Sequence, residues 1–243
     1  KPSVVVHLAA VSHANRSNKD PHSTFDHSLR TLENALDNSK NRVDHFIFLS
    51  SSMVYGNFKK KTVNENDICN PLGIYAALKF SAEKIIKAYN QVFDLPYTII
   101  RPSALYGERC ISRRVGQIFI ENALNNKEIK IHGDGSDKLD FTYIGDLING
   151  IVKIIKTSKS KNKIFNLTHG KARSINDLLK ILKKTFPNIL IKKIPRDKLM
   201  PKRGTLSTKK AKKILNYKSE WPIEKGYPEY ISWYLDFFQK TKK

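Results

Sequence analysis

An apolar strand that ends in three serines, followed by a long helix carrying a tyrosine and a lysine, constrains this chain more than any other feature. Residues 47–49 form an apolar run suited to a buried strand, and Ser50, Ser51 and Ser52 follow directly. The helix is indicated by apolar residues at helical spacing: Leu78, Ala82, Ile85, Ile86, Tyr89 and Phe93. In an open α/β sheet, strand ends of this kind lie at the carboxyl edge, where ligands bind.

Tyr75 and Lys79 are four residues apart on this helix and therefore share one face. An ammonium group beside a phenol favours the phenolate, so we expect the pKa of Tyr75 to be lowered toward neutrality. With a serine hydroxyl nearby, such a base could take the hydroxyl proton of an alcohol that is oxidised by a hydride acceptor. The alternative interpretation is a core tyrosine beside a solvated lysine, since this spacing alone is common.

Strands and helices alternate over the first hundred residues. A β-branched strand begins at Val4, Phe25, Leu29, Leu32 and Leu36 mark an amphipathic helix, and residues 97–100 form another β-rich run. We therefore predict an α/β fold with a doubly wound parallel sheet. We expect residues 1–107 to belong to a dinucleotide-binding domain. Residues 108–243 would form mainly a smaller α+β lobe, with a helix near 147–156 and a strand near 164–167 returning to the sheet.

Further motifs extend the pattern beyond the serines, Tyr75 and Lys79. They are His7-Leu8-Ala9-Ala10, Asp20-Pro21, Arg101-Pro102-Ser103-Ala104-Leu105-Tyr106-Gly107, Gly133-Asp134-Gly135, and Asp140-Phe141-Thr142-Tyr143-Ile144 with Asp146. In this order the chain resembles the extended short-chain dehydrogenase/reductase family of nucleotide-sugar epimerases and dehydratases. The resemblance covers nearly the whole chain and implies a Rossmann-type sheet and an NAD-dependent enzyme of carbohydrate metabolism.

The resemblance also assigns roles to residues. It implies Ser51, Tyr75 and Lys79 as catalytic residues, with Tyr75 as the base. The cofactor would be NAD, with NADP as an alternative, and no metal is implied. The implied cofactor contacts are Leu8, Ala9, Ala10, Ser50, Tyr75, Lys79, Pro102 and Ser103. The implied substrate contacts are Ser12, Ser52 and Arg203.

Several positions depart from the family pattern. Dehydratases place an Asp-Glu pair after the catalytic hydroxyl, where this chain has Ser52 and Met53, so we expect no elimination of water. An arginine that usually reaches the substrate diphosphate is Leu139 here. The expected activity is therefore epimerisation of a nucleotide sugar, of the UDP-hexose 4-epimerase type. A ketoreductase that consumes NADPH is the alternative.

The glycine-rich turn that binds a dinucleotide pyrophosphate does not occur among the eleven glycines of this sequence. By resemblance the sequence starts at the family's fourth strand, so we expect an N-terminally truncated sheet and an inactive fragment of a longer protein. The strand from Val4 would then be an open, aggregation-prone edge, and NAD would bind poorly. The alternative is a non-catalytic binding protein that has lost the cofactor cradle.

The net charge of +22 is concentrated in residues 151–243, which hold 25 Lys/Arg against six Asp/Glu. Because the lysines are scattered and lack interleaved aromatic residues, we do not expect nucleic acid as a partner. Cys69 and Cys110 show no metal-ligand spacing, and the sequence has no apolar run of membrane-spanning length. We expect a cytoplasmic homodimer, when full length, that binds a nucleotide sugar and no membrane.

Overall fold

The computed structural model of the chain describes residues 2–12 and 14–241, with side chains described as far as Phe238. Its centre is a four-stranded parallel sheet in the order β1-β2-β4-β9. The strands are β1 (Val4–His7), β2 (His45–Leu49), β4 (Tyr97–Arg101) and β9 (Lys163–Asn166). The predicted Rossmann-type parallel sheet is therefore confirmed.

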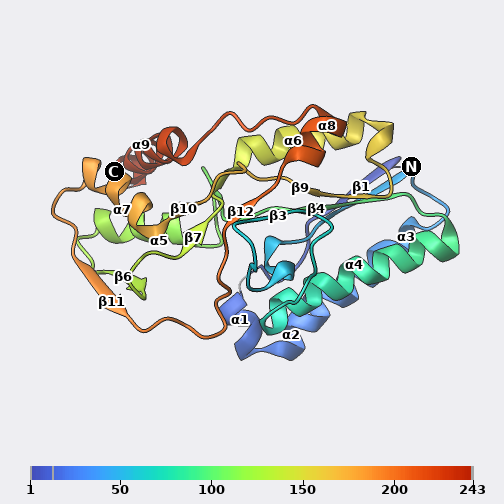
Figure 1. Cartoon of the computed structure of the whole chain (residues 1–243), viewed down its shortest axis with the longest axis horizontal. Helices are drawn as coiled ribbons and strands as arrows, with labels where there is room; N and C mark the ends of the chain where they lie inside the picture. Colours follow the sequence, from blue (N-terminus) through green and yellow to red (C-terminus); the bar gives the residue numbers. More distant parts are fainter. Residues whose placement is uncertain (1, 13, 242–243) are drawn as a thin grey trace.

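Helices cover both faces of this sheet (Figure 1). One face packs against α3 (Thr31–Ser39) and α4 (Gly73–Phe93), and the other against α6 (Ile144–Lys156) and α8 (Lys209–Leu215). Successive side chains of a strand point to opposite faces. Accordingly, Phe46 and Phe48 join the core beside α3 and α4, whereas Ile47 joins the core beside α6 and α8. Burial on both faces explains why β2 reads as a continuous apolar run.

A second group of elements lies beyond the carboxyl ends of the strands (Figure 1). It contains the helices α5 (Val115–Leu124), α7 (Ile175–Thr185) and α9 (Ile223–Thr241), and the parallel pair β6 (Ile129–His132) and β11 (Ile191–Ile194). Its core is aromatic and aliphatic, with Phe119, Leu178, Tyr227 and Tyr230 buried together. Ser174 caps α7 in a capping box with Asp177.

Short strand pairs join the two groups. They are β3 (Thr62–Val63) with β12 (Thr205–Leu206), β5 (Leu105–Tyr106) with β8 (Thr142–Tyr143), and β7 (Lys138–Leu139) with β10 (Arg173–Ser174). Two short 3-10 segments are η2 (Ser52–Tyr55) and η3 (Ser158–Ser160). The division into two domains near residue 107 stays a prediction. Within residues 2–12 and 14–241, no helix is long and apolar enough to cross a membrane.

The helical run before β2 differs from the single amphipathic helix that the sequence predicts. It is divided into α1 (Ala14–Lys19), α2 (Pro21–Phe25), a π-helical turn η1 (Asp26–Arg30) and α3. A π turn holds one residue more than an α turn and therefore rotates the residues before it relative to those after it. As a result Leu32 and Leu36 are buried, whereas Phe25 is 47% exposed.

Candidate active site

Three strand ends and the start of one helix meet at the carboxyl edge of the sheet. Ala9 and Ala10 follow β1, Ser51 follows β2, and Ser103 follows β4. Tyr75 lies in the first turn of α4, which begins near these strand ends. The sheet edge therefore brings together most of the residues that the sequence assigned to catalysis and cofactor binding.

Ser51 is held by the backbone that follows it. It is the N-cap of η2, and the amide of Met53 donates to its Oγ at 3.2 Å. The turn ends at Gly56, where φ is +66° and an added Cβ would lie 1.9 Å from the carbonyl oxygen of Asn70. Only glycine fits this close approach. The turn thus fixes the hydroxyl of Ser51 at the strand end.

The hydroxyl of Ser51 lies close enough to the Tyr75 phenol to affect its pKa. Burial nevertheless raises the pKa of the Tyr75 phenol, although Ser51 and the charges of Arg114 and Arg203 act to lower it. The expectation that Lys79 lowers this pKa is therefore wrong for this structure. Desolvation of the phenolate exceeds the favourable interactions, and the nearby cations that stabilise the phenolate are arginines.

Lys79 is buried below Tyr75 and points to the end of β2. Its Nζ donates to the carbonyl oxygen of Leu49 at 2.7 Å and lies 4.7 Å from the centre of the Phe48 ring. Burial lowers the pKa of Lys79 to about 8, and the carboxylate of Glu83 raises it. A titrating lysine beside the tyrosine is typical of a catalytic site.

A pocket opens next to these residues. It is lined by Ala9, Ala10, Thr24, Ser28, Leu29, Phe48, Tyr75, Leu78, Lys79 and Ala82. Small apolar walls around a few convergent polar groups are typical of a cofactor site. Leu8 and Ser12, which the sequence assigned to cofactor and substrate, are exposed and are not among the lining residues.

The π-helical turn shapes one wall of this pocket. It directs the hydroxyl of Ser28 to the amide of Val11, which donates to it at 3.2 Å. That bond ties the loop after β1, which carries Ala9 and Ala10, to the helix. π turns often mark functional sites. Sequence periodicity did not reveal this wall, because a π turn interrupts the regular helical spacing.

Buried hydroxyls lie at the ends of β2 and β4. Within the described part of the chain, the Oγ atoms of Ser52 and Ser103 have no hydrogen-bond partner. The amide of Ser52 donates to the carbonyl oxygen of Pro102 at 2.9 Å, so the two loops are adjacent. Ser50 differs, since its hydroxyl donates to Glu83 at 2.6 Å. Buried polar groups without partners require an explanation, and a bound ligand would supply the partners.

Arg203 reaches the same site from the far end of the sequence. Its Nε atom is buried and finds no partner among residues 2–12 and 14–241. Burial and the like charge of Arg114 lower the pKa of Arg203 to about 10, whereas Asp137 and Tyr75 raise it. A desolvated guanidinium beside a second arginine favours the binding of an anion. Arg114 belongs to no sequence motif, so its part in the site could not be predicted from the sequence.

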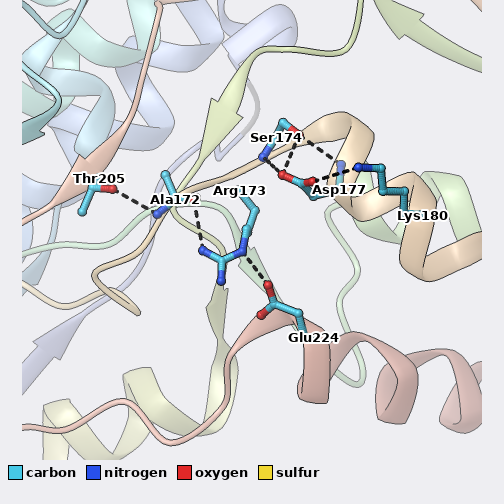
Figure 2. A network of polar contacts seen from close by, with 7 residues as sticks. All are labelled: Ala172, Arg173, Ser174, Asp177, Lys180, Thr205 and Glu224. Atoms are coloured by element: carbon cyan, nitrogen blue, oxygen red, sulfur yellow. Dashed lines mark hydrogen bonds and ion pairs between the residues drawn. The ribbon is translucent and has the colours of Figure 1, made fainter.

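Two tethers hold the segment that carries Arg203. The amide of Phe58 donates to the carbonyl of Lys202 at 2.8 Å, and the amide of Lys202 donates to Asn57 at 2.7 Å. Figure 2 shows the other tether, where the amide of Ala172 donates to Thr205 Oγ1 at 3.1 Å. These hydrogen bonds join the loop after Ser51 to the segment that carries Arg203.

The fold and this site define a Rossmann-type protein of the extended short-chain dehydrogenase/reductase class, with a serine, a tyrosine and a lysine at the edge of a parallel sheet. Comparison with known proteins specifies the family. The chain belongs to the NAD dependent epimerase/dehydratase family, whose model matches residues 1–168.

Relatives and solved structures agree with this family. The chain is 30% identical over 238 residues to a UDP-glucuronate 4-epimerase of Thermodesulfobacterium geofontis, covering 95% of this chain and 72% of the relative. It superposes with a TM-score of 0.92 on UDP-glucuronic acid 4-epimerase from Bacillus cereus, solved with UDP-glucuronic acid and NAD. That match has 28% identity and covers 97% of this chain and 76% of the other.

A second solved structure is UDP-glucose 4-epimerase from Thermotoga maritima, solved with UDP-glucose. Its TM-score is 0.87 at 27% identity, with 100% of this chain and 79% of the other covered. Epimerases are isomerases. The family match and these epimerase relatives confirm the prediction of an enzyme of this family. The roles of the individual site residues stay predictions.

Proposed function

We propose that this protein is an NAD-dependent nucleotide-sugar 4-epimerase that acts on a UDP-hexose. The observation that carries the proposal is the juxtaposition of Ser51 and Tyr75 at the sheet edge, within reach of the charge of Arg203. A proton-transfer group and an anion-binding group thus meet at one sheet edge. The relatives described above, which are named as 4-epimerases of UDP-sugars, support the same substrate class.

The residues present suit the nicotinamide half of NAD. Ala9 and Ala10 line the pocket together with Tyr75 and Lys79, and the buried hydroxyl of Ser103 offers a hydrogen bond. Lys79 would bind the ribose hydroxyls next to the nicotinamide. When bound, NAD supplies a hydride acceptor that returns the same hydride at the end of the reaction. NADP stays the alternative cofactor.

Tyr75 would act as the base that takes the C4 hydroxyl proton of the sugar. Ser51 donates or accepts the hydrogen bond that orients this proton transfer. The raised pKa of Tyr75 means that the phenol must be activated when the site is loaded. The cationic charges of Arg114 and Arg203 are the groups of this chain that can stabilise the phenolate.

Arg203 and Arg114 would bind the diphosphate of the nucleotide sugar. Two guanidinium groups can each form charge-assisted bonds with phosphate oxygens. Ser52 would contact the sugar through its free hydroxyl. Ser52 and Met53 carry no carboxyl group, which disfavours the acid–base elimination of water that a dehydratase requires. We further propose that the working protein is a cytoplasmic homodimer.

The test is to incubate the full-length protein with NAD and either UDP-glucose or UDP-glucuronate, and to follow the C4 epimers by proton NMR. Epimerisation should approach the same ratio from either epimer, with no net change in NADH absorbance. Net consumption of NADPH with a 4-keto sugar would identify a ketoreductase instead. Binding of UDP-sugar without any conversion would identify a non-catalytic binding protein.

A further inference from the structure

A buried ion pair lies directly beneath the site, between α4 and β4. Arg101 Nε donates to Glu83 Oε1 at 2.9 Å, and Arg101 Nη2 donates to Glu83 Oε2 at 2.6 Å. The side chains are 3% and 1% exposed. This bidentate geometry is the strongest arrangement for an arginine and a carboxylate. The pair therefore joins the catalytic helix rigidly to the sheet.

The same carboxylate also binds the strand that carries the catalytic serine. Ser50 Oγ donates to Glu83 Oε1 at 2.6 Å, and Ser50 is the residue before Ser51. Arg101 is in turn the last residue of β4 and lies over the ring of Tyr55 at 4.8 Å. Glu83 thus fixes the ends of β2 and β4 to one helix at a single point.

Glu83 lies one helical turn after Lys79, on the same face of α4. The elements around Lys79 offer no second carboxylate among the described residues. His7 faces Lys79 from β1, and the Phe48 ring and the Leu49 carbonyl face it from β2. The pocket wall formed by α2 and η1 consists of the uncharged residues Thr24, Ser28 and Leu29. The carboxylate of Glu83 is therefore the one anion near Lys79 in the described structure, with Arg101 behind it and Tyr75 one turn before Lys79.

A buried ion pair seldom adds much to stability, because desolvation of both charges offsets their attraction. Its position suggests another role. We propose that the Glu83–Arg101 pair is a positioning unit for the active site, which fixes α4 to the ends of β2 and β4 and keeps Lys79 charged at the Leu49 carbonyl. Its catalytic consequence rests on the function proposed above for Lys79, whereas its effect on the charge of Lys79 does not.

The test measures the titration of Lys79 directly. Protein produced with lysine labelled by 13C at Cε is titrated by NMR, and the Lys79 signal is assigned by its loss in Lys79→Arg. Glu83→Gln preserves the size of the side chain and removes its charge. We expect the Lys79 titration to move down by about one pH unit, the usual effect of losing a close opposite charge. The alkaline limb of the kcat/KM profile should move by the same amount.

Glu83→Asp is the complementary variant to Glu83→Gln, because it keeps the negative charge and shortens the side chain. It should lower the melting temperature and leave the Lys79 titration within a few tenths of a unit. Thr98→Val is the matched structural control. It removes buried hydrogen bonds to His45 and the Ser160 carbonyl at the opposite end of the same strands, and should not move the titration.

Glu83→Gln leaves Arg101 as a lone buried cation and could prevent folding. The double variant Glu83→Gln with Arg101→Met removes both charges and avoids that cost. It should shift the Lys79 titration downward by a smaller amount, because the repelling charge of Arg101 is removed together with the attracting charge of Glu83. An unchanged Lys79 titration in either folded variant, or equal shifts in Glu83→Asp and Glu83→Gln, would overturn the proposal. A shift without any epimerisation would support the positioning unit and contradict the proposed function.

Discussion

The backbone amide of Leu206 donates a hydrogen bond of 3.0 Å to the buried carboxylate of Asp140, which lies 66 positions earlier in the chain. The same carboxylate accepts the amide of Gly170 at 3.0 Å and the hydroxyl of Thr168 at 3.2 Å. One side chain therefore holds β12, the loop after β9 and the start of β8 together. Arg203 lies three residues before Leu206, so its position depends on this carboxylate.

We expect Asp140→Asn to destabilise the protein by about 1–3 kcal/mol at pH 7, because an amide NH2 would face backbone donors that now bind a carboxylate. The free energy of unfolding is measured by urea denaturation. Asp134→Asn, on an exposed position of the preceding hairpin, is the control and should stay within about 0.5 kcal/mol of the parent. Equal effects of the two changes would contradict this account of Asp140.

In the full-length protein, Tyr75→Phe should lower kcat of epimerisation by at least about 10²-fold, the usual contribution of a positioned acid–base group. Affinity for UDP should change little, because the phenol is assigned to the sugar hydroxyl. Initial rates and calorimetric titration measure the two quantities. Tyr89→Phe removes a hydroxyl further along the same helix and should leave kcat unaltered. Activity of Tyr75→Phe within a few-fold of the parent would exclude Tyr75 as the base.

Arg203→Ala should weaken UDP binding about 10- to 100-fold, as expected for loss of a charge-assisted contact with a diphosphate. Arg173→Ala is a matched control in the same lobe, since its guanidinium is already paired with Glu224 (Figure 2). Lys159→Ala tests whether removal of any one positive charge from the protein surface weakens UDP binding. Calorimetry should show little change for either control. Losses of similar size in all three variants would indicate general attraction by the basic lobe.

Gly56→Ala should cost at least about 2 kcal/mol of stability, because the residue has positive φ and its Cβ would collide with the backbone at Asn70. Gly133→Ala separates the cost of positive φ from the cost of the backbone collision. Gly133 has a similar φ of +68°, but its Cβ would meet only Arg196 at 3.8 Å. We expect about 1 kcal/mol for that change. Urea denaturation that ranks the two variants the other way would contradict the close contact at Gly56.

Stability should depend on pH through His45, which is buried and hydrogen-bonded to Thr98 at 2.7 Å. Burial lowers the pKa of His45 to about 4, below its unfolded value of about 6.5. Between these values the unfolded state binds the extra proton. The contribution of neutral His45 to the free energy of unfolding is therefore complete above pH 6.5. About 3 kcal/mol of stability is lost as the pH falls from 6.5 to 4.

Urea denaturation at pH 7, 5.5 and 4.5 measures this loss. His45→Gln keeps a nitrogen near Thr98 and does not titrate, so its stability should fall less over the same range. Burial also lowers the pKa of His7, which adds a loss in the same direction to both proteins. Parallel pH profiles for the parent and His45→Gln would contradict the assignment to His45.

The sheet and its serine-rich edge could be predicted from sequence because both depend on local patterns. The apolar run before Ser50 marked β2, and helical spacing placed Tyr75 and Lys79 on one face of α4. The capping box of Ser174 and Asp177 is a local pattern of the same kind. These signals are reliable because backbone geometry fixes the side-chain period at two residues in a strand and 3.6 residues in a helix, and also fixes the chemistry of helix caps.

The electrostatics of the site could not be predicted in this way. Arg114, Asp137 and Arg203 approach one another only after folding, and no spacing in the sequence links them. Burial of Tyr75, which reverses the expected direction of its pKa, is a tertiary property as well. Glu83 did leave a signal, four residues after Lys79, but its importance depends on Arg101, which lies on another element.

The tether between residues 57–58 and Lys202 has a consequence for engineering and for sequence divergence. A chimera that exchanges the substrate lobe alone would join a foreign arginine segment to a resident loop and break the hydrogen bonds of Asn57 and Phe58. The β3–β12 pairing would lose its register at the same time. Residues 57–63 and 201–207 therefore form one exchangeable module, and a graft for new substrate specificity has to transfer both.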